Sequence, residues 1–132
     1  MFIDAHLHTI RSQGLPRNGA GENFATPEEL LLMMDRTGVE RGLLLPEVSP
    51  ECTFQMSTNE DILDVCAQYP ERFIPCCNVD PRAGSNCSAT DLSTHLSYYI
   101  ERGCKGFGEI SANLSFTDPL VLNLLHHCEA TG

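Results

Sequence analysis

The chain has no tryptophan and few positive charges, and it lacks the signals of several protein classes. Its 8 lysines and arginines stand against 18 aspartates and glutamates, so the net charge is −10 at pH 7. Such a chain repels a phosphate backbone and an anionic lipid surface, which makes nucleic acid and membranes poor partners. No stretch approaches the roughly 18 apolar residues of a transmembrane helix, and no basic segment precedes an apolar core as in a signal peptide. The sequence therefore predicts a cytoplasmic protein.

Two kinds of cofactor motif are also missing. No G-x-G-x-x-G follows the first expected strand, and Gly14, Gly19 and Gly21 do not have phosphate-loop spacing, so nucleotide binding is not expected. The cysteines are odd in number and show no C-x-x-C spacing, which argues against a disulfide framework or a zinc knuckle. They are Cys52, Cys66, Cys76, Cys77, Cys87, Cys104 and Cys128. We expect reduced thiols that mostly pack as small apolar groups.

The N-terminal segment carries the strongest indication of chemistry. Side chains two positions apart in a β-strand leave the same face, so His6 and His8 should project together and suit one metal ion. Asp4 is expected on that face too, where it would orient a histidine or anchor the strand. The other face is expected to be apolar and covered by helices, with Ile3, Ala5 and Leu7. A structural role for the two histidines remains the alternative at this point.

Helix boundary signals divide the rest of the chain into regular units. Thr26 and Pro27 predict a helix that closes at Gly38, followed by a strand over 40–45. Ser57 and Glu60 have capping-box spacing and predict a second helix, which stops before Pro70 and precedes a strand over 72–79.

The same signals continue to the end of the chain. Thr90 is expected to cap a helix that ends at Gly103, and a strand is expected over 104–110. Asp118 and Pro119 open a last helix with Gly132 at its C-cap. Its expected apolar stripe consists of Leu120, Leu124 and Leu125. The predicted order is therefore βαβαβαβα.

Regular spacing of the strands indicates the architecture. They start near residues 2, 40, 72 and 104, and strands that alternate with helices at this period form a parallel sheet. We expect one α/β domain over residues 1–132. Two architectures fit: a small doubly wound sheet, or the first four units of a (β/α)₈ barrel, which needs about 250 residues.

The segment Met1 to His8, together with Glu109 at the end of the fourth strand in Lys105-Gly106-Phe107-Gly108-Glu109-Ile110, resembles the metal-dependent amidohydrolase superfamily. The similarity is greatest to the group that includes TatD-like hydrolases and aminocarboxymuconate-semialdehyde decarboxylase-like enzymes. It covers four β/α units, the N-terminal half of a TIM barrel. It implies a divalent metal, commonly zinc, held by His6, His8 and Glu109 at the C-terminal face.

The resemblance also implies what this half lacks. In the family, two more histidines and a catalytic aspartate come from later strands, so no catalytic residue is assigned here. We expect hydrolysis of a small-molecule substrate by metal-activated water, with the 132-residue chain inactive alone and joined to a C-terminal half or to another copy. The alternatives are non-oxidative decarboxylation on the same scaffold and a non-catalytic α/β interaction module.

The remaining candidate residues have ordinary structural explanations. Asp80 lies in an Asp-Pro turn signal after the third strand. His126 and His127 are adjacent on a helix and point about 100° apart, so they are expected on its surface or in packing, as is His95. Met33 and Met34 continue a leucine run and are expected in the core.

Overall fold

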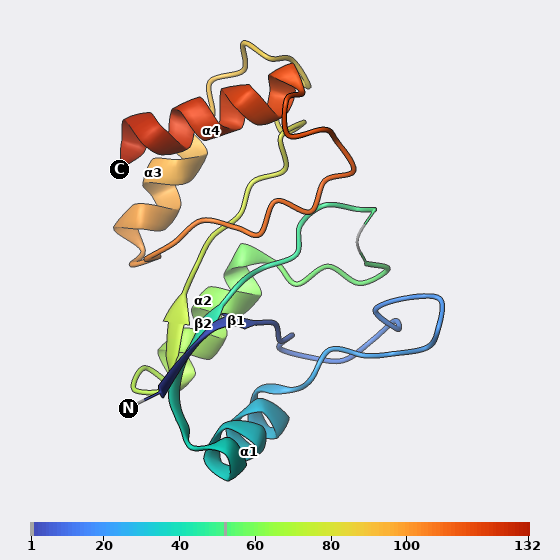
Figure 1. Cartoon of the computed structure of the whole chain (residues 1–132), viewed down its shortest axis with the longest axis vertical. Helices are drawn as coiled ribbons and strands as arrows, with labels where there is room; N and C mark the ends of the chain where they lie inside the picture. Colours follow the sequence, from blue (N-terminus) through green and yellow to red (C-terminus); the bar gives the residue numbers. More distant parts are fainter. Residues whose placement is uncertain (1, 52) are drawn as a thin grey trace.

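A three-stranded parallel sheet with four helices forms the fold (Figure 1), and the computed structural model describes residues 2–51 and 53–132. The strand order is β1-β2-β3, so β2 is central. The strands are β1 (Phe2–Leu7), β2 (Val39–Leu44) and β3 (Phe73–Pro75). The helices are α1 (Pro27–Thr37), α2 (Asn59–Gln68), α3 (Ser93–Glu101) and α4 (Pro119–Thr131). None of these helices is long and apolar enough to cross a membrane.

The pairing of β1 with β2 contains an irregularity that changes the faces of β1. Asp4 opposes Gly42 and Leu7 opposes Leu44, so both project on one face although three positions separate them. Such an offset is typical of a β-bulge, which breaks simple alternation. The expectation that Asp4 shares the face of the histidines is therefore wrong.

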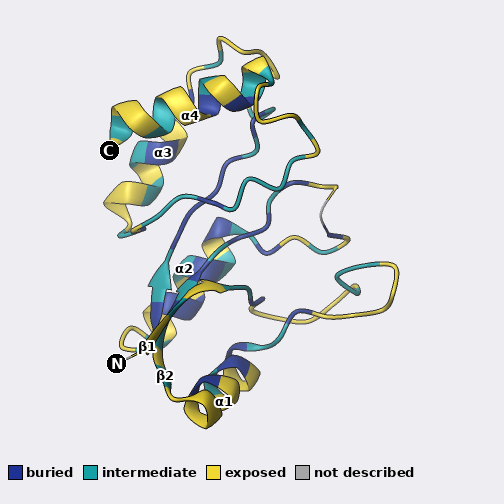
Figure 2. Cartoon of the chain, viewed as in Figure 1, coloured by how far each residue is buried: buried dark blue, intermediate teal, exposed yellow. Residues whose placement is uncertain are grey.

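The expected helix cover of β1 is also incomplete. Leu7 packs against the core, whereas Ile3 keeps 51% of its surface exposed and Ala5 is exposed as well. Figure 2 shows β1 as a largely exposed strand. This exposure follows from the position of β1 at an edge of the sheet, with only β2 beside it in the described residues.

Helix α1 begins and ends where the sequence predicts. The Thr26 side chain accepts a hydrogen bond from the Glu29 main-chain N–H, the Glu29 carboxylate accepts one from the Thr26 N–H, and Pro27 occupies the first turn. Gly38 ends the helix with φ of 73°, a left-handed conformation that glycine adopts without a steric penalty.

The other helix starts differ from the predictions in two places. In α2 the capping box is formed by Thr58 and Asp61, one residue after the expected pair. In α3 Thr90 does not cap the helix: Leu92 is at the N-cap position without a side-chain cap, and Asp91 before it accepts a hydrogen bond from the Ser93 N–H. In α2 the expected cap Ser57 stands next to Thr58, which has the same chemistry, so the sequence alone did not determine which one caps.

Helix α4 has the predicted start but a rotated apolar face. Asp118 caps its N-terminus by accepting from the Leu120 N–H. Val121 and Leu124 are buried, whereas Leu125 is 42% exposed. The expected stripe was wrong at Leu125 because the helix packs through the Val121 and Leu124 side.

The apolar core consists of two clusters at opposite ends of the molecule (Figure 1). The first joins α1 and α2 to the sheet: Leu30, Met34, Leu44, Ile62, Val65, Cys66 and Phe73. The second lies between α3, α4 and the segment after β3: Val79, Leu92, Leu96 and Leu124. Met34 is in the core as expected, but Met33 is 52% exposed.

The expected fourth strand is reduced to a short paired segment. Main-chain bonds join Lys105 N to Pro75 O and Cys77 N to Gly106 O, and Cys77 forms a single parallel bridge with Phe107. Gly108 has φ of 130°, outside the strand region, so the pairing ends there. The segment 104–110 thus lies beside the continuation of β3 as predicted, but it forms no regular strand.

Candidate metal site

His6 and His8 meet at the C-terminal end of β1. Their Nε2 atoms are 2.9 Å apart, so both rings are on one side of the sheet as the sequence predicts. His8 is the more buried, with 13% side-chain exposure against 55% for His6. The His8 Nδ1 atom lies 2.9 Å from the Leu45 carbonyl oxygen. Because a carbonyl only accepts, this contact favours the tautomer of neutral His8 with the proton on Nδ1, in which the Nε2 lone pair can bind a ligand.

Glu109 completes the group from a distant part of the chain. Its carboxylate oxygens lie 3.0 Å from His6 Nε2 and 3.8 Å from His8 Nε2. One ligand atom from each of the three residues falls within 4.8 Å of the others. This is the only group of three or more such residues within residues 2–51 and 53–132.

The spacing of the three donor atoms suits a small divalent cation. Two tetrahedral ligands at about 2.0 to 2.1 Å from zinc are themselves about 3.3 Å apart, and a carboxylate ligand lies at a similar distance. The observed separations of 2.9, 3.0 and 3.8 Å lie on either side of that value. Two imidazoles and one carboxylate are also a usual zinc donor set. The residues present therefore fit the metal that the resemblance implies.

Asn78 holds the backbone of Glu109 in place, and no sequence pattern singled it out. It is 2% exposed, and its Nδ2 donates to the Glu109 carbonyl at 2.5 Å. The main chain of Asn78 is in turn held by Asn59, whose amide bonds both its N–H and its carbonyl at 2.8 and 2.9 Å. This network joins α2 and the end of β3 to the segment that carries Glu109.

Glu47 and Arg17 form a charged pair behind His8. Glu47 is 1% exposed, and its Oε1 lies 3.7 Å from His8 Nδ1 and 2.5 Å from Arg17 Nη2. The guanidinium also stacks over the Phe24 ring, with 4.9 Å to the centroid. Sequence reasoning missed this pair because the two residues are 30 positions apart and neither belongs to a motif. The pair places a buried negative charge beside the histidine that is most enclosed.

The two aspartates considered from sequence have structural contacts. Asp4 accepts a hydrogen bond from the His6 main-chain N–H at 2.9 Å, so it anchors the strand. Asp80 accepts from the Arg82 N–H at 2.8 Å, which forms the expected turn. Burial acts to raise the pKa of Asp80, but hydrogen bonds from Arg82 and Ser49 outweigh it and lower the pKa to about 2. Asp80 is therefore held as a carboxylate in an ion pair.

The remaining histidines lie outside this site. His95 and His126 are exposed, and His127 is half-buried with its Nδ1 3.8 Å from Asp91. Of the cysteines, those in the described residues have free thiols, and Cys52 lies outside the described residues.

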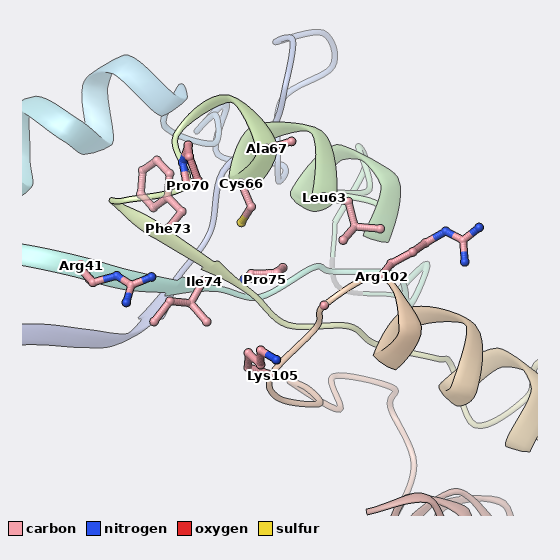
Figure 3. A pocket seen from close by; sticks show the side chains of 11 residues that line it. Arg41, Leu63, Cys66, Ala67, Pro70, Phe73, Ile74, Pro75, Arg102 and Lys105 are labelled. Atoms are coloured by element: carbon pink, nitrogen blue, oxygen red, sulfur yellow. The ribbon is translucent and has the colours of Figure 1, made fainter.

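A groove of about 410 Å³ lies along β3 (Figure 3). Its lining residues come from β2, α2, β3 and the segment before Gly106, with Arg41, Phe73 and Lys105 among them. None of the three candidate metal ligands lines it. The groove is therefore separate from the His6, His8 and Glu109 site.

The fold resembles half of a known barrel type. No protein family matches the sequence, and no curated protein matches it either. The chain is similar to a probable 2-pyrone-4,6-dicarboxylic acid hydrolase from Acinetobacter baumannii with citric acid bound (17% identity, TM-score 0.62). It is equally similar to an uncharacterized TIM-barrel protein from Bordetella bronchiseptica (17% identity, TM-score 0.64). Each match covers 98% of this chain but only 46% and 52% of the other chains, respectively. The chain thus has the fold of about half a TIM barrel.

Proposed function

We propose that this chain is one half of a metal-dependent hydrolase of the amidohydrolase type. His6, His8 and Glu109 would hold a divalent metal, with zinc expected, at the C-terminal ends of the strands. The observation that carries the proposal is the convergence of three donor atoms within 4.8 Å from segments about a hundred residues apart. In TIM barrels this end of the sheet carries the active site.

Each residue has a definite task in this proposal. The hydrogen bond to the Leu45 carbonyl keeps the His8 proton on Nδ1, so that Nε2 faces the site as a neutral donor. Glu109 contributes the negative charge, and Asn78 holds its backbone in place. A divalent metal supplies Lewis acidity, which activates water as a nucleophile and polarises an electrophilic group.

A second half would complete the enzyme. The three residues leave coordination positions open, and none of them is free to transfer protons once it binds a metal. We therefore expect further ligands and a proton-transferring carboxylate from a C-terminal half or from another copy of the chain. The exposed edge of β1, where Phe2 is 72% exposed and Ile3 51%, is the surface such a half would cover.

Hydrolysis is favoured over decarboxylation because one of the structural neighbours is a probable hydrolase. Decarboxylation would use the same metal-binding residues, so only analysis of the reaction products of the completed enzyme would distinguish it from hydrolysis. A non-catalytic module would require no metal, and metal binding therefore separates it from both enzymes.

Zinc titration of the purified chain tests the proposal. We expect one zinc ion per chain by calorimetry, and at least a tenfold loss of affinity in each of His6→Ala, His8→Ala and Glu109→Gln. His95→Ala removes an exposed histidine elsewhere and should bind zinc as the unaltered chain does. Equal zinc affinity in all five proteins would contradict the proposal.

Sedimentation and activity measurements test the need for a second half. The 132-residue chain should self-associate or aggregate and show no esterase or phosphodiesterase turnover with added zinc. A stable monomer with zinc-dependent turnover would show that the site is complete without a second half.

A further inference from the structure

Five of the cysteines lie close enough to interact with one another, and none of them belongs to the His6, His8 and Glu109 group. Cys104 interacts electrostatically with Cys66, Cys76 and Cys77, and Cys77 with Cys128. Three of these residues, Cys77, Cys104 and Cys128, line one cavity of about 420 Å³ between the 104–107 segment and helices α3 and α4. The proposed hydrolase site uses none of them.

Cys77 and Cys104 are in direct contact within this group. The backbone brings them together, because Lys105 N bonds Pro75 O at 2.8 Å and Cys77 N bonds Gly106 O at 2.9 Å. Their side chains share a hydrogen bond, in which the Cys77 thiol donates to the Cys104 sulfur. That bond raises the pKa of Cys77 and lowers the pKa of Cys104. Cys104 is therefore the better nucleophile of the two.

The cavity gives a small oxidant access to this pair. Cys104 and Cys77 are only 7% and 3% exposed, but both line the cavity. Hydrogen peroxide is close to water in size, so it fits within this cavity of about 420 Å³. Peroxide reacts with thiolates, and a sulfenic acid that forms beside a second thiol condenses with it to a disulfide.

We propose that Cys77 and Cys104 form a peroxide-sensitive thiol pair that closes to a disulfide. The Cys104 thiolate attacks one peroxide oxygen, the O–O bond breaks, and the hydroxide that leaves takes up a proton to give water. Cys77 then attacks the sulfur of the Cys104 sulfenic acid, and the S–O bond breaks with loss of a second water. Two thiols are oxidised by two electrons, and one peroxide is reduced to two waters.

The disulfide would tie the 104–110 segment to the end of β3. That segment forms no regular strand, and its pairing consists of a few main-chain bonds before Glu109. A covalent link five residues before Glu109 would therefore restrain a segment that is otherwise loosely paired.

Peptide mapping of the full chain after peroxide treatment tests this proposal. The reduced chain is exposed to hydrogen peroxide, and remaining thiols are blocked with N-ethylmaleimide before trypsin digestion. We expect peptide 103–105 to be linked to peptide 73–82, because trypsin cleaves after Arg72, Arg82, Arg102 and Lys105. This readout needs no variant and no bound metal, so it is independent of the proposed hydrolase function.

Three variants assign the link to particular residues. Cys76→Ser should retain it, which separates Cys77 from its neighbour in the same peptide. Cys77→Ser should lose it and leave a sulfenic acid at Cys104 that dimedone traps. Cys87→Ser removes an exposed thiol and should behave as the unaltered chain does. Oxidation of Cys87 alone, or a link between any other two cysteines, would overturn the proposal.

Discussion

Asn78 holds the backbone of Glu109 by a hydrogen bond. Replacing Asn78 should therefore release Glu109 from its place beside His6 and His8. Asn78→Ala removes the donor to the Glu109 carbonyl, which lies 2.5 Å from Nδ2. It also removes a longer contact of 3.4 Å with the Pro46 carbonyl. A buried carbonyl left without a donor costs about 1 to 3 kcal/mol. Because the second contact is weak, we expect about 2 to 3 kcal/mol of lost stability in total.

The same substitution should weaken zinc binding. With its backbone released, Glu109 must be ordered again when the metal binds, and loss of such a supporting contact typically lowers affinity about tenfold or more. Urea unfolding measures the first effect and calorimetric zinc titration the second. Asn123→Ala is the matched control, because its Nδ2 donates to the Thr90 carbonyl at 2.9 Å, away from the site. Unchanged zinc affinity in a folded Asn78→Ala protein would refute the reasoning.

Other substitutions test the packing and the ion pairs. Leu124→Ala should lower the free energy of unfolding by about 2 to 5 kcal/mol, since Leu124 is fully buried, whereas Leu125→Ala should cost less than about 1 kcal/mol. Gly42→Ala should cost about 1 to 3 kcal/mol, because the new methyl group would overlap Leu7 Cδ1, and Leu7→Ala should cancel part of that cost in a double-mutant cycle. Asp80 has its pKa lowered from 3.8 to about 2 in the folded state, so it stabilises the fold above pH 4, and this contribution should be lost as the pH falls from about 4 to 2. Acid unfolding of Asp80→Asn should show a smaller loss of stability over that range.

Local sequence signals were sufficient for most of the elements. The cap of α1 could be predicted because Thr26, Pro27 and Glu29 all favour the same start, and Gly38 the same end. The cap of α2 was displaced by one residue because Ser57 and Thr58 offer the same chemistry. The helix boundary signals and the regular period of the units predicted a strand over 104–110, but Gly108 leaves the strand conformation and the pairing ends there.

The same reasoning from the sequence predicted only part of the candidate site. Spacing was enough to predict that His6 and His8 meet, since a β-strand brings alternate side chains together whatever its neighbours are. Asp4 could not be placed, because the irregular pairing with β2 depends on a second strand. Glu47 and Asn78 act through contacts with residues about 30 positions away, and no local pattern encodes such contacts.

Anomalous X-ray diffraction at the zinc absorption edge, on crystals grown with zinc, tests the central claim most directly. We predict one anomalous peak at about 2.0 to 2.2 Å from His6 Nε2, His8 Nε2 and a carboxylate oxygen of Glu109. Zinc bound elsewhere, or no peak while the three side chains keep direct hydrogen bonds to one another, would contradict the account.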